Sequence, residues 1–401
     1  MTVETITLGC RLNFAESEMM RGHAEGGDMV IVNSCAVTSE AVRQTRQAIR
    51  RARRARPEAR IVVTGCAAQL DPHAFAAMPE VDRVVGNSDK YRAGSFAHGD
   101  AQKILVSDVM LAPAPPVAAG FLSRVRSFVA VQTGCDHRCT FCTIWQARGP
   151  SRSLPYEAIR EAIVRELEAG AREIVLTGVD ITSYEKGPGQ LCQRLLGDLP
   201  ALQRLRLSSL DSIEIDDALM ELVAGEPRLL PHFHLSLQAG DDLILKRMKR
   251  RHSRSDAVAT IARLKAARQD VTIGADLIAG FPTETEAAAL NTLALLDECD
   301  VIAAHIFPFS PRPNTPAARM PQLAHEVIRA RAARLRSVAA ARRNAWLDRQ
   351  IGSHQTVLIE NGAKGHSDAF APVTVAGSLR GECRGARITE RRGDHLIGIF
   401  E

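Results

Sequence analysis

Six of the nine cysteines stand at spacings that suit metal binding. Three of them, Cys135, Cys139 and Cys142, fall in the segment GCDHRCTFC with the pattern C-x3-C-x2-C. Thiolates this close together can hold three irons of a [4Fe–4S] cluster and leave the fourth iron open to another ligand. A structural zinc site is the alternative, but it wants four closed ligands, and His137 would have to supply the fourth from an awkward spacing within the loop. The spacing therefore favours the cluster.

The other three cysteines each follow an apolar run. Cys10 ends ETITLGC, Cys35 ends MVIVNSC and Cys66 ends RIVVTGC. Ligands of an open parallel α/β sheet bind just beyond the carboxyl ends of its strands, so three such thiols can converge although they lie far apart in the sequence. One strand-end cysteine alone would be interpreted as a small buried hydrophobic residue. Three in the same register predict a shared metal site.

Alternating strand and helix patterns must position both triads. The first hundred residues combine helical stretches such as Ser39–Arg56 with apolar runs, which predicts an α/β domain with a parallel sheet over residues 1–111. The predicted strands are Glu4–Leu8, Met29–Val32, Ile61–Val63, Arg83–Val85 and Ile104–Val106. A Pro/Ala-rich stretch, Ala112–Gly120, follows and is interpreted as an inter-domain linker.

A second alternating series begins after this stretch. Its amphipathic helices, for example Tyr156–Ala169, separate six predicted strands, which favours a partial (β/α)6 barrel. These strands are Phe128–Gln132, Glu173–Thr177, Leu205–Ser208, His234–Gln238, Thr272–Ile278 and Ile302–Phe307. With a trailing Arg/Ala-rich helix, roughly Ala324–Gln350, this central domain is expected to span residues 121–350.

The C-terminal residues 351–401 change character again. Short apolar runs with Gly-rich turns predict a small all-β barrel. Its predicted strands are Val357–Glu360, Val373–Ala376, Ala386–Glu390 and His395–Phe400. The fold class is therefore α/β, with a parallel-sheet domain, a partial barrel and a small β-barrel in that order.

Composition narrows the class of protein. Hydrophobic residues make up 45% and charged residues 24% of the 401 residues, as in an ordinary soluble globular protein. No apolar run approaches the ~20 residues of a membrane helix and the N-terminus lacks a signal-peptide pattern, so we expect a cytoplasmic protein with no membrane partner. In that reducing compartment the cysteines in motifs are expected to bind metal or catalyse rather than form disulfides.

The C-x3-C-x-Φ-C pattern, in which Phe141 is the aromatic residue, resembles the radical S-adenosylmethionine (SAM) superfamily. The resemblance implies that SAM binds the open iron and that an electron from the cluster cleaves it to methionine and a 5′-deoxyadenosyl radical. It makes the three cysteines of this loop the catalytic residues. The SAM contacts that it implies, in and around LTGVD, SSLD and LSLQAG, are Phe141, Gly178, Ser209 and Gln238.

Nearly the whole chain resembles one branch of that superfamily, the methylthiotransferases, through LGCRLN, NSCAVTSEA and TGCAAQ. The resemblance implies a second [4Fe–4S] cluster on Cys10, Cys35 and Cys66 that carries or donates sulfur, and a C-terminal TRAM-like RNA-binding barrel. Five further segments are most similar to the branch that acts on threonylcarbamoyladenosine in tRNA. They are NSCAVT, RQTRQAIRRARR, RGPSRS, FSPRPNTPAARMP and LTGVDITSY. Trp145 and Gln146 depart from the family, which usually has a proline-containing segment after the third cysteine.

The implied reaction converts N6-threonylcarbamoyladenosine at position 37 of tRNA to its 2-methylthio derivative. One SAM would supply the methyl group and a second the radical, and a flavodoxin or ferredoxin would donate electrons. The same chemistry on isopentenyladenosine in tRNA or on an aspartate of a ribosomal protein is an alternative. A non-catalytic iron–sulfur RNA-binding protein is another, although binding alone would not require an open iron.

Basic stretches favour a tRNA partner independently of the resemblance. Arginines recur along the Ser39–Arg56 helix with little acid between them, and more follow in the C-terminal module. Neutralising RNA phosphates needs such patches, whereas a merely solvated helix face is the alternative. The residues expected to contact tRNA, which would be bound by its anticodon loop, are Arg50, Arg53, Arg54, Arg380 and Arg384.

Overall fold

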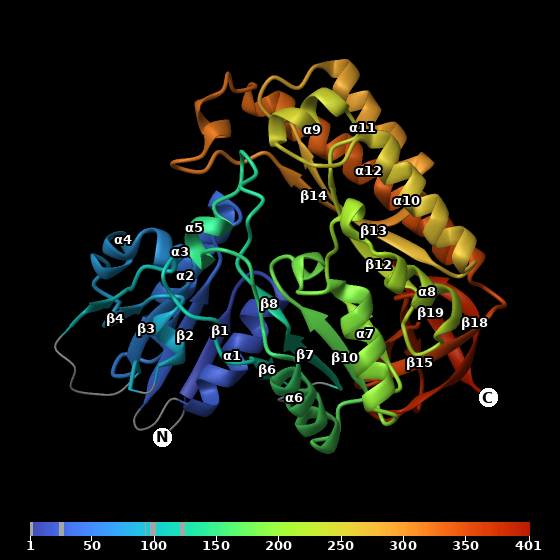
Figure 1. Cartoon of the computed structure of the whole chain (residues 1–401), viewed down its shortest axis with the longest axis horizontal. Helices are drawn as coiled ribbons and strands as arrows, with labels where there is room; N and C mark the ends of the chain where they lie inside the picture. The colour runs from blue at the N-terminus through green and yellow to red at the C-terminus, as the bar shows by residue number, and fades with distance from the viewer. Residues whose placement is uncertain (1–2, 24–27, 93, 97–101, 121–124) are drawn as a thin grey trace.

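The computed structural model describes residues 3–23, 28–92, 94–96, 102–120 and 125–401. The chain builds an N-terminal parallel sheet, then a curved set of central strands, then a closed barrel at the C-terminal end (Figure 1). This is the fold class that the sequence predicts. Among the described residues, no helix is long and apolar enough to cross a membrane.

The N-terminal sheet has five parallel strands in the order β1-β2-β3-β4-β5. Successive residues of β2 face opposite sides: Val30 and Val32 share a core with Ile49 of α2, whereas Ile31 shares one with Met20 of α1. Helices thus cover both faces, which accounts for the apolar strands. The elements are β1 (Val3–Thr7), α1 (Arg11–His23), β2 (Met29–Ser34), α2 (Ser39–Ala55), β3 (Arg60–Gly65), α3 (Cys66–Leu70), α4 (Pro72–Ala76), β4 (Arg83–Val85), the 3₁₀ turn Asp89–Tyr91 and β5 (Ile104–Leu105).

The central strands form two sheets, β11-β10-β7-β6 and β12-β13-β14. The gap between β11 and β12 is bridged where the Leu210 amide donates to the His234 carbonyl at 2.8 Å and the Ser236 amide donates to the Leu210 carbonyl at 2.9 Å. Together with their helices, the six parallel strands make the expected partial barrel. The strands are β6 (Ala119–Gly120), β7 (Arg126–Ala130), β10 (Glu173–Thr177), β11 (Leu205–Leu207), β12 (His232–Gln238), β13 (Thr272–Ala279) and β14 (Val301–Pro308). A separate antiparallel pair, β8 (Gln132–Thr133) and β9 (Arg152–Ser153), flanks the cysteine loop and α5 in the sequence.

Helices join these strands and continue the chain to its C-terminal barrel. The short α5 directly follows the GCDHRCTFC loop. The long α12 begins and ends within one residue of its predicted bounds. The helices are α5 (Ile144–Arg148), α6 (Tyr156–Glu168), α7 (Gly187–Asp198), α8 (Asp217–Gly225), α9 (Asp242–Met248), α10 (Arg254–Ala267), α11 (Glu286–Glu298) and α12 (His325–Arg349), with 3₁₀ turns at Ile181–Ser183, Ser212–Glu214 and Pro316–Arg319.

The stretch interpreted as a linker ends in a strand. Its last two residues form β6, which pairs antiparallel with β7, and α1 packs on both strands. Phe14 of α1 meets Phe128 of β7 edge to face, with ring centroids 5.4 Å apart. The N-terminal sheet is therefore attached to the central strands through its first helix. The expected domain boundary at residue 121 lies outside the described residues.

The C-terminal barrel closes in the order β15-β16-β17-β19-β18. It has one strand more than predicted, β16. The sequence of β16, KGHS, lacks apolar alternation, but its backbone pairs with both β15 and β17. Trp346 and Leu347 at the end of α12 enter the core of the barrel. The strands are β15 (His354–Asn361), β16 (Lys364–Ser367), β17 (Pro372–Val375), β18 (Cys383–Arg392) and β19 (His395–Phe400).

Candidate active site

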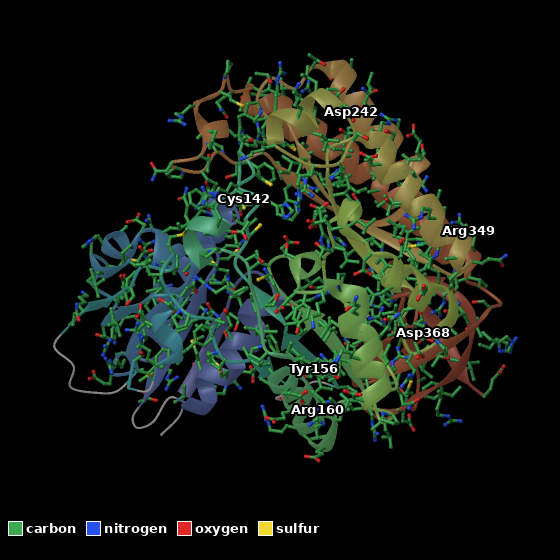
Figure 2. The ribbon with its side chains drawn as sticks, viewed as in Figure 1. Cys142, Tyr156, Arg160, Asp242, Arg349 and Asp368 are labelled. Carbon is green, nitrogen blue, oxygen red and sulfur yellow. The ribbon has the colours of Figure 1, made fainter. Side chains whose placement is uncertain are left out.

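The loop that carries Cys135, Cys139 and Cys142 follows β8 and is held by main-chain hydrogen bonds. The Cys135 amide donates to the Gly149 carbonyl at 3.1 Å, and the Thr140 amide donates to the carbonyl of Met248 at 3.0 Å. Cys139 is buried and the other two thiols are partly exposed. Figure 2 shows Cys142 beside α5, facing the middle of the molecule. The predicted strand-end loop is thus clamped between α5 and the end of α9.

Charged groups surround this central triad. Burial raises the pKa of Cys142 to about 12, and the neighbouring Cys139 and Cys66 act in the same direction. On the opposite side, the Arg250 guanidinium lies 3.7 Å from the Cys139 sulfur and is anchored by the Asp211 carboxylate at 2.8 Å. Thiolates are the metal-binding form, and nearby positive charge, from Arg250 or from a bound metal, favours the loss of the thiol protons.

His137, the fourth ligand that a zinc site in this loop would need, lies close to Cys135 and Asp180. Its Nε2 lies 2.8 Å from the Asp180 carboxylate, and Asp211 and Glu214 each lie 3.6 Å from the ring. Hydrogen bonds to Asp180 and Glu214 raise the pKa of His137 to about 10. The imidazole is therefore a cation held by acids at the ends of the barrel strands.

The N-terminal triad sits at the carboxyl ends of β1, β2 and β3, as predicted. Gly9 and Gly65 precede Cys10 and Cys66 with φ angles of +98° and +93°. A Cβ at Gly9 would stand 2.8 Å from the Cys35 sulfur, and one at Gly65 would stand 2.4 Å from the Ser34 carbonyl. Only glycine allows these turns to close, and they bring the turn before Cys10 against Cys35 and the turn before Cys66 against Ser34.

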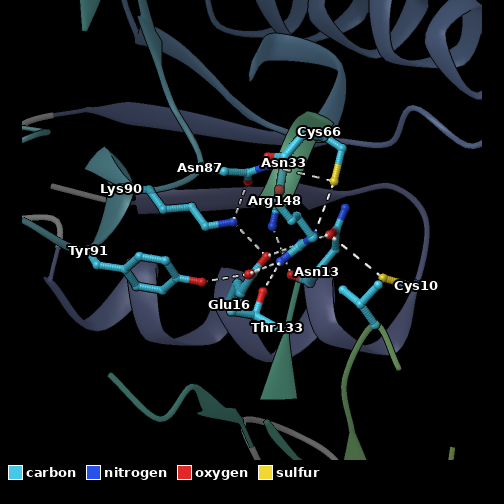
Figure 3. Close-up of polar contacts among 12 residues, drawn as sticks. Cys10, Asn13, Glu16, Asn33, Cys66, Asn87, Lys90, Tyr91, Thr133 and Arg148 are labelled. Atoms are coloured by element: carbon cyan, nitrogen blue, oxygen red, sulfur yellow. Dashed lines mark hydrogen bonds and ion pairs between the residues drawn. The ribbon is translucent and has the colours of Figure 1, made fainter. Parts of the chain in front are cut away.

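A buried polar network ties this triad to the central strands (Figure 3). Its centre is Arg148 at the end of α5. The guanidinium pairs with both Glu16 oxygens at 2.7 and 2.9 Å, donates to Asn13 at 2.7 Å, and approaches the Cys66 sulfur at 3.3 Å. Lys90 adds a second cation 2.7 Å from Glu16. Arg148 lies in the RGPSRS motif, but no sequence pattern indicates its role or that of Glu16, because the contact joins residues far apart in the chain.

The distances between the thiols show whether each triad can hold a single zinc ion or a larger iron–sulfur cluster. Two thiolates on one zinc ion stand no more than about 4.6 Å apart, since each Zn–S bond is about 2.3 Å. Among the described residues, the three-ligand sets whose atoms all lie within 4.8 Å of one another include neither cysteine triad. Each complete triad is therefore wider than a single zinc ion allows, and it suits a larger group such as an iron–sulfur cluster. Cys135 on its own lies within 4.8 Å of His137 and Asp180, but that set leaves out the other two cysteines of the loop.

The residues predicted to contact SAM gather at the carboxyl end of the barrel strands. Gly178 follows β10, where a Cβ would meet Ile181 at 2.8 Å. Gln238 ends β12 with a φ of +65°, and Ser209 follows β11. Phe141 packs edge to face on Phe281, with centroids 6.4 Å apart. The structure thus places all of them on the side of the sheet that carries the central triad.

The predicted RNA-binding arginines differ in their surroundings. Arg53 is engaged within the fold, since it donates to the carbonyls of Pro57, Ala59 and Glu80 and pairs with Asp82 at 2.6 Å. The others are exposed on α2 or on the C-terminal barrel, where Arg384 also lies over the Phe400 ring. These exposed residues are Arg50, Arg54, Arg380 and Arg384.

A cavity of about 800 Å³ opens between α2, α5 and the loop after β14. Ala67, next to Cys66, and Thr143, next to Cys142, both line it. The volume is that of a site for a small organic ligand. Its wall therefore includes the chain neighbour of one cysteine from each triad, although none of the six cysteines lines it.

Known proteins match this chain over most of its length. Residues 129–296 match the radical SAM superfamily, and residues 2–86 match the uncharacterized protein family UPF0004. The threonylcarbamoyladenosine tRNA methylthiotransferase MtaB of Rickettsia prowazekii is 45% identical over 92% of this chain and 90% of its own length. The tRNA-2-methylthio-N(6)-dimethylallyladenosine synthase of Cereibacter sphaeroides is 32% identical over 98% of this chain and 97% of its own length.

A solved structure shares the fold. The radical SAM methyltransferase TsrM from Kitasatospora setae superimposes with a TM-score of 0.55 at 14% identity, over 77% of this chain and 68% of that chain. At that identity the likeness concerns the fold alone.

Proposed function

Because this chain belongs to the radical SAM tRNA methylthiotransferase family, we propose that it converts N6-threonylcarbamoyladenosine at position 37 of tRNA to the 2-methylthio derivative. The observation that carries the proposal is the cavity whose wall includes Ala67 and Thr143, the chain neighbours of Cys66 and Cys142. A base held there would lie against the residues that follow one cysteine of each triad in the chain. The relative with 45% identity, which is named for the threonylcarbamoyl substrate, supports this branch over the dimethylallyl branch.

We assign Cys135, Cys139 and Cys142 to a [4Fe–4S] cluster with an open iron for SAM, and Cys10, Cys35 and Cys66 to a second [4Fe–4S] cluster. When bound, the first cluster with SAM supplies a 5′-deoxyadenosyl radical, and the second supplies sulfur. The residues of the chain bind and orient these groups. Arg250 and Arg148 place positive charge beside one thiol of each triad. Phe141, Gly178, Ser209 and Gln238 are the proposed SAM contacts.

The partners follow from the same proposal. Residues 1–111 would carry the second cluster, 121–350 the radical chemistry, and the barrel of 351–401 would bind RNA as a TRAM-like module. The anticodon loop of tRNA would meet exposed arginines of α2 and of the barrel. A flavodoxin or ferredoxin would deliver electrons.

One assay tests both the reaction and the division of labour. Reconstituted protein is incubated anaerobically with SAM, a reductant and tRNA that carries threonylcarbamoyladenosine, and nucleosides and 5′-deoxyadenosine are measured by mass spectrometry. Wild type should form both the 2-methylthio nucleoside and 5′-deoxyadenosine. Cys139→Ala should form neither, whereas Cys35→Ala should still release 5′-deoxyadenosine.

Iron analysis accompanies this assay. Wild type should hold about eight irons per chain, and Cys10, Cys35 and Cys66 changed together to Ala should leave about four. Turnover of isopentenyladenosine tRNA in place of threonylcarbamoyladenosine tRNA would move the protein to the sister branch. Retained 5′-deoxyadenosine in Cys139→Ala would overturn the assignment of the central loop.

A further inference from the structure

The cavity between α2, α5 and the loop after β14 is lined by four of the described arginines. Arg43, Arg46 and Arg50 stand at helical spacing on one face of α2 and line it, and Arg312 lines it from the loop after β14. Asp71 is the one acid among its described lining residues, and its carboxylate already accepts a hydrogen bond from the Ala74 amide at 3.2 Å. The wall therefore carries an excess of positive charge.

Two of these four arginines, Arg46 and Arg312, lack an acidic partner among the described residues. The other two have one, since Arg43 pairs with Glu40 and Arg50 lies 3.9 Å from Glu80. Within the part of the chain that the structure describes, neither Arg46 nor Arg312 has a carboxylate within 4.0 Å. The Nε atoms of both are buried without a hydrogen-bond acceptor. A buried donor without an acceptor is costly, so these two groups suit an anionic ligand that supplies one.

Arg312 is also held in place. Its Nη1 donates to the Ser39 hydroxyl at 3.2 Å, and Ser39 is tied back to Ser310, whose hydroxyl donates to that of Ser39 at 2.9 Å. The loop after β14 is thereby pinned to the start of α2, and the guanidinium is oriented before any ligand arrives. A preorganised fork of donors is the arrangement that binds a carboxylate in two-point geometry.

The substrates of the threonylcarbamoyl and dimethylallyl branches differ in whether the N6 substituent carries an anionic group. A threonylcarbamoyl group on N6 ends in a carboxylate, whereas a dimethylallyl group has no polar atom. We propose that Arg312, with Arg46 across the cavity, binds the carboxylate of the threonylcarbamoyl group, so that this cavity is the subsite that selects the N6 substituent. The inference rests on the proposed function and deepens it. A tRNA phosphate is the other anion that these arginines would accept, and the test separates the two.

Binding of three tRNAs that differ only at position 37 provides the test: one with adenosine, one with threonylcarbamoyladenosine and one with isopentenyladenosine. Reconstituted full-length wild type should bind the threonylcarbamoyl form about ten- to a hundredfold more tightly than the adenosine form, as a charge-assisted hydrogen bond allows. Arg312→Gln should erase this preference and leave the affinity for the adenosine form unchanged. Arg46→Gln should reduce the preference as well, and it provides an independent variant on the other wall.

Arg319→Gln is the matched control, because that arginine is exposed in the same segment but does not line the cavity. It should keep the wild-type preference, and circular dichroism should show that all three variants are folded. An equal loss of affinity for all three tRNAs in Arg312→Gln would mean a phosphate contact and would overturn the inference. So would an unchanged preference in both Arg312→Gln and Arg46→Gln. In either case wild type would still modify the threonylcarbamoyl tRNA, whereas failure of the proposed function would appear as wild type that does not.

Discussion

At the scale of single residues, each cysteine triad is paired with one buried arginine. Arg148 approaches Cys66 and is held by Glu16, and Arg250 approaches Cys139 and is held by Asp211. In both cases a carboxylate fixes a guanidinium against sulfur. Positive charge beside a thiol favours the thiolate, which is the form that binds iron. The arginines are therefore positioning residues for the proposed clusters.

We expect Arg148→Met to lower the free energy of unfolding of the apoprotein by about 3–5 kcal/mol, because it removes the main counter-charge of the buried Glu16. Lys90 compensates only part of that charge. Glu16→Gln alone leaves Arg148 and Lys90 as two buried cations without their carboxylate, whereas the double variant leaves only Lys90, so it should lose less than the sum of the two single variants. Urea unfolding measures all three.

Arg160→Met is the control for this experiment. Arg160 (labelled in Figure 2) pairs with Glu157 on the solvent side of α6, and its loss should have little effect because water screens such pairs. Strictly additive losses for Arg148→Met and Glu16→Gln would contradict the coupling.

At the scale of elements, the arginines of α2 fall into two groups, one bound within the protein and one exposed to solvent. Thr45, Ile49 and Ala52 face the core of the N-terminal sheet. Arg53 at the edge of that face binds the loops around it, whereas Arg50 and Arg54 are exposed to solvent. A basic helix face of this kind can meet RNA phosphates without disturbing the core.

We expect Arg50→Ala with Arg54→Ala, or Arg380→Ala with Arg384→Ala on the barrel, to weaken tRNA binding. Each lost phosphate contact should make the slope of log affinity against log salt shallower by about one unit. Filter binding at several salt concentrations measures the slope. Arg53→Ala should instead lower stability, since its partners lie within the protein. If neither pair changes the slope, the two basic surfaces are solvated faces and do not bind tRNA.

At the scale of the whole molecule, the C-terminal barrel is docked on the central strands through charged and aromatic groups. Phe370 stacks between His232 and His366, with centroids 5.2 and 4.6 Å apart, and the Arg206 guanidinium lies 4.8 Å above its ring. The buried Glu173 of β10 holds Arg206 at 3.0 Å. The arginines that bridge the two units are thus neutralised from the central side.

This junction predicts a dependence of stability on pH. Burial acts to raise the pKa of Glu173, but Arg206, Arg126 and Arg204 outweigh it and lower the pKa to about 2. The pKa of a glutamate in an unfolded chain is about 4.3. The ion pairs of Glu173 therefore stabilise the fold above about pH 4, and this stabilisation is lost as the pH falls toward about 2.

We expect Glu173→Gln to lower the urea midpoint at pH 7 and to flatten its fall between about pH 4 and 2. Glu168→Gln, an exposed neighbour on α6, should leave the wild-type profile. Parallel profiles for wild type and Glu173→Gln would show that this carboxylate is not the group responsible.

The sequence by itself determined the features that depend on neighbours along the chain. Apolar runs that end in Gly-Cys or Ser-Cys placed Cys10, Cys35 and Cys66 at one sheet edge, because the carboxyl ends of parallel strands share that edge. The same local periodicity predicted the order of the three units and the partial barrel. The tight C-x3-C-x2-C spacing needed no fold to indicate a metal site.

Only the tertiary structure decided which distant groups meet. Arg148 and Glu16 form one buried pair although 132 positions separate them, and Arg312 reaches Ser39 at the start of α2 across 273 positions. β16 and β6 were missed because their strand character comes from partners and not from apolar alternation. Likewise, a sequence cannot say which arginine of α2 is engaged inside and which is free for a ligand. Such contacts depend on how whole elements pack, and the type of a residue does not determine which distant residue it contacts.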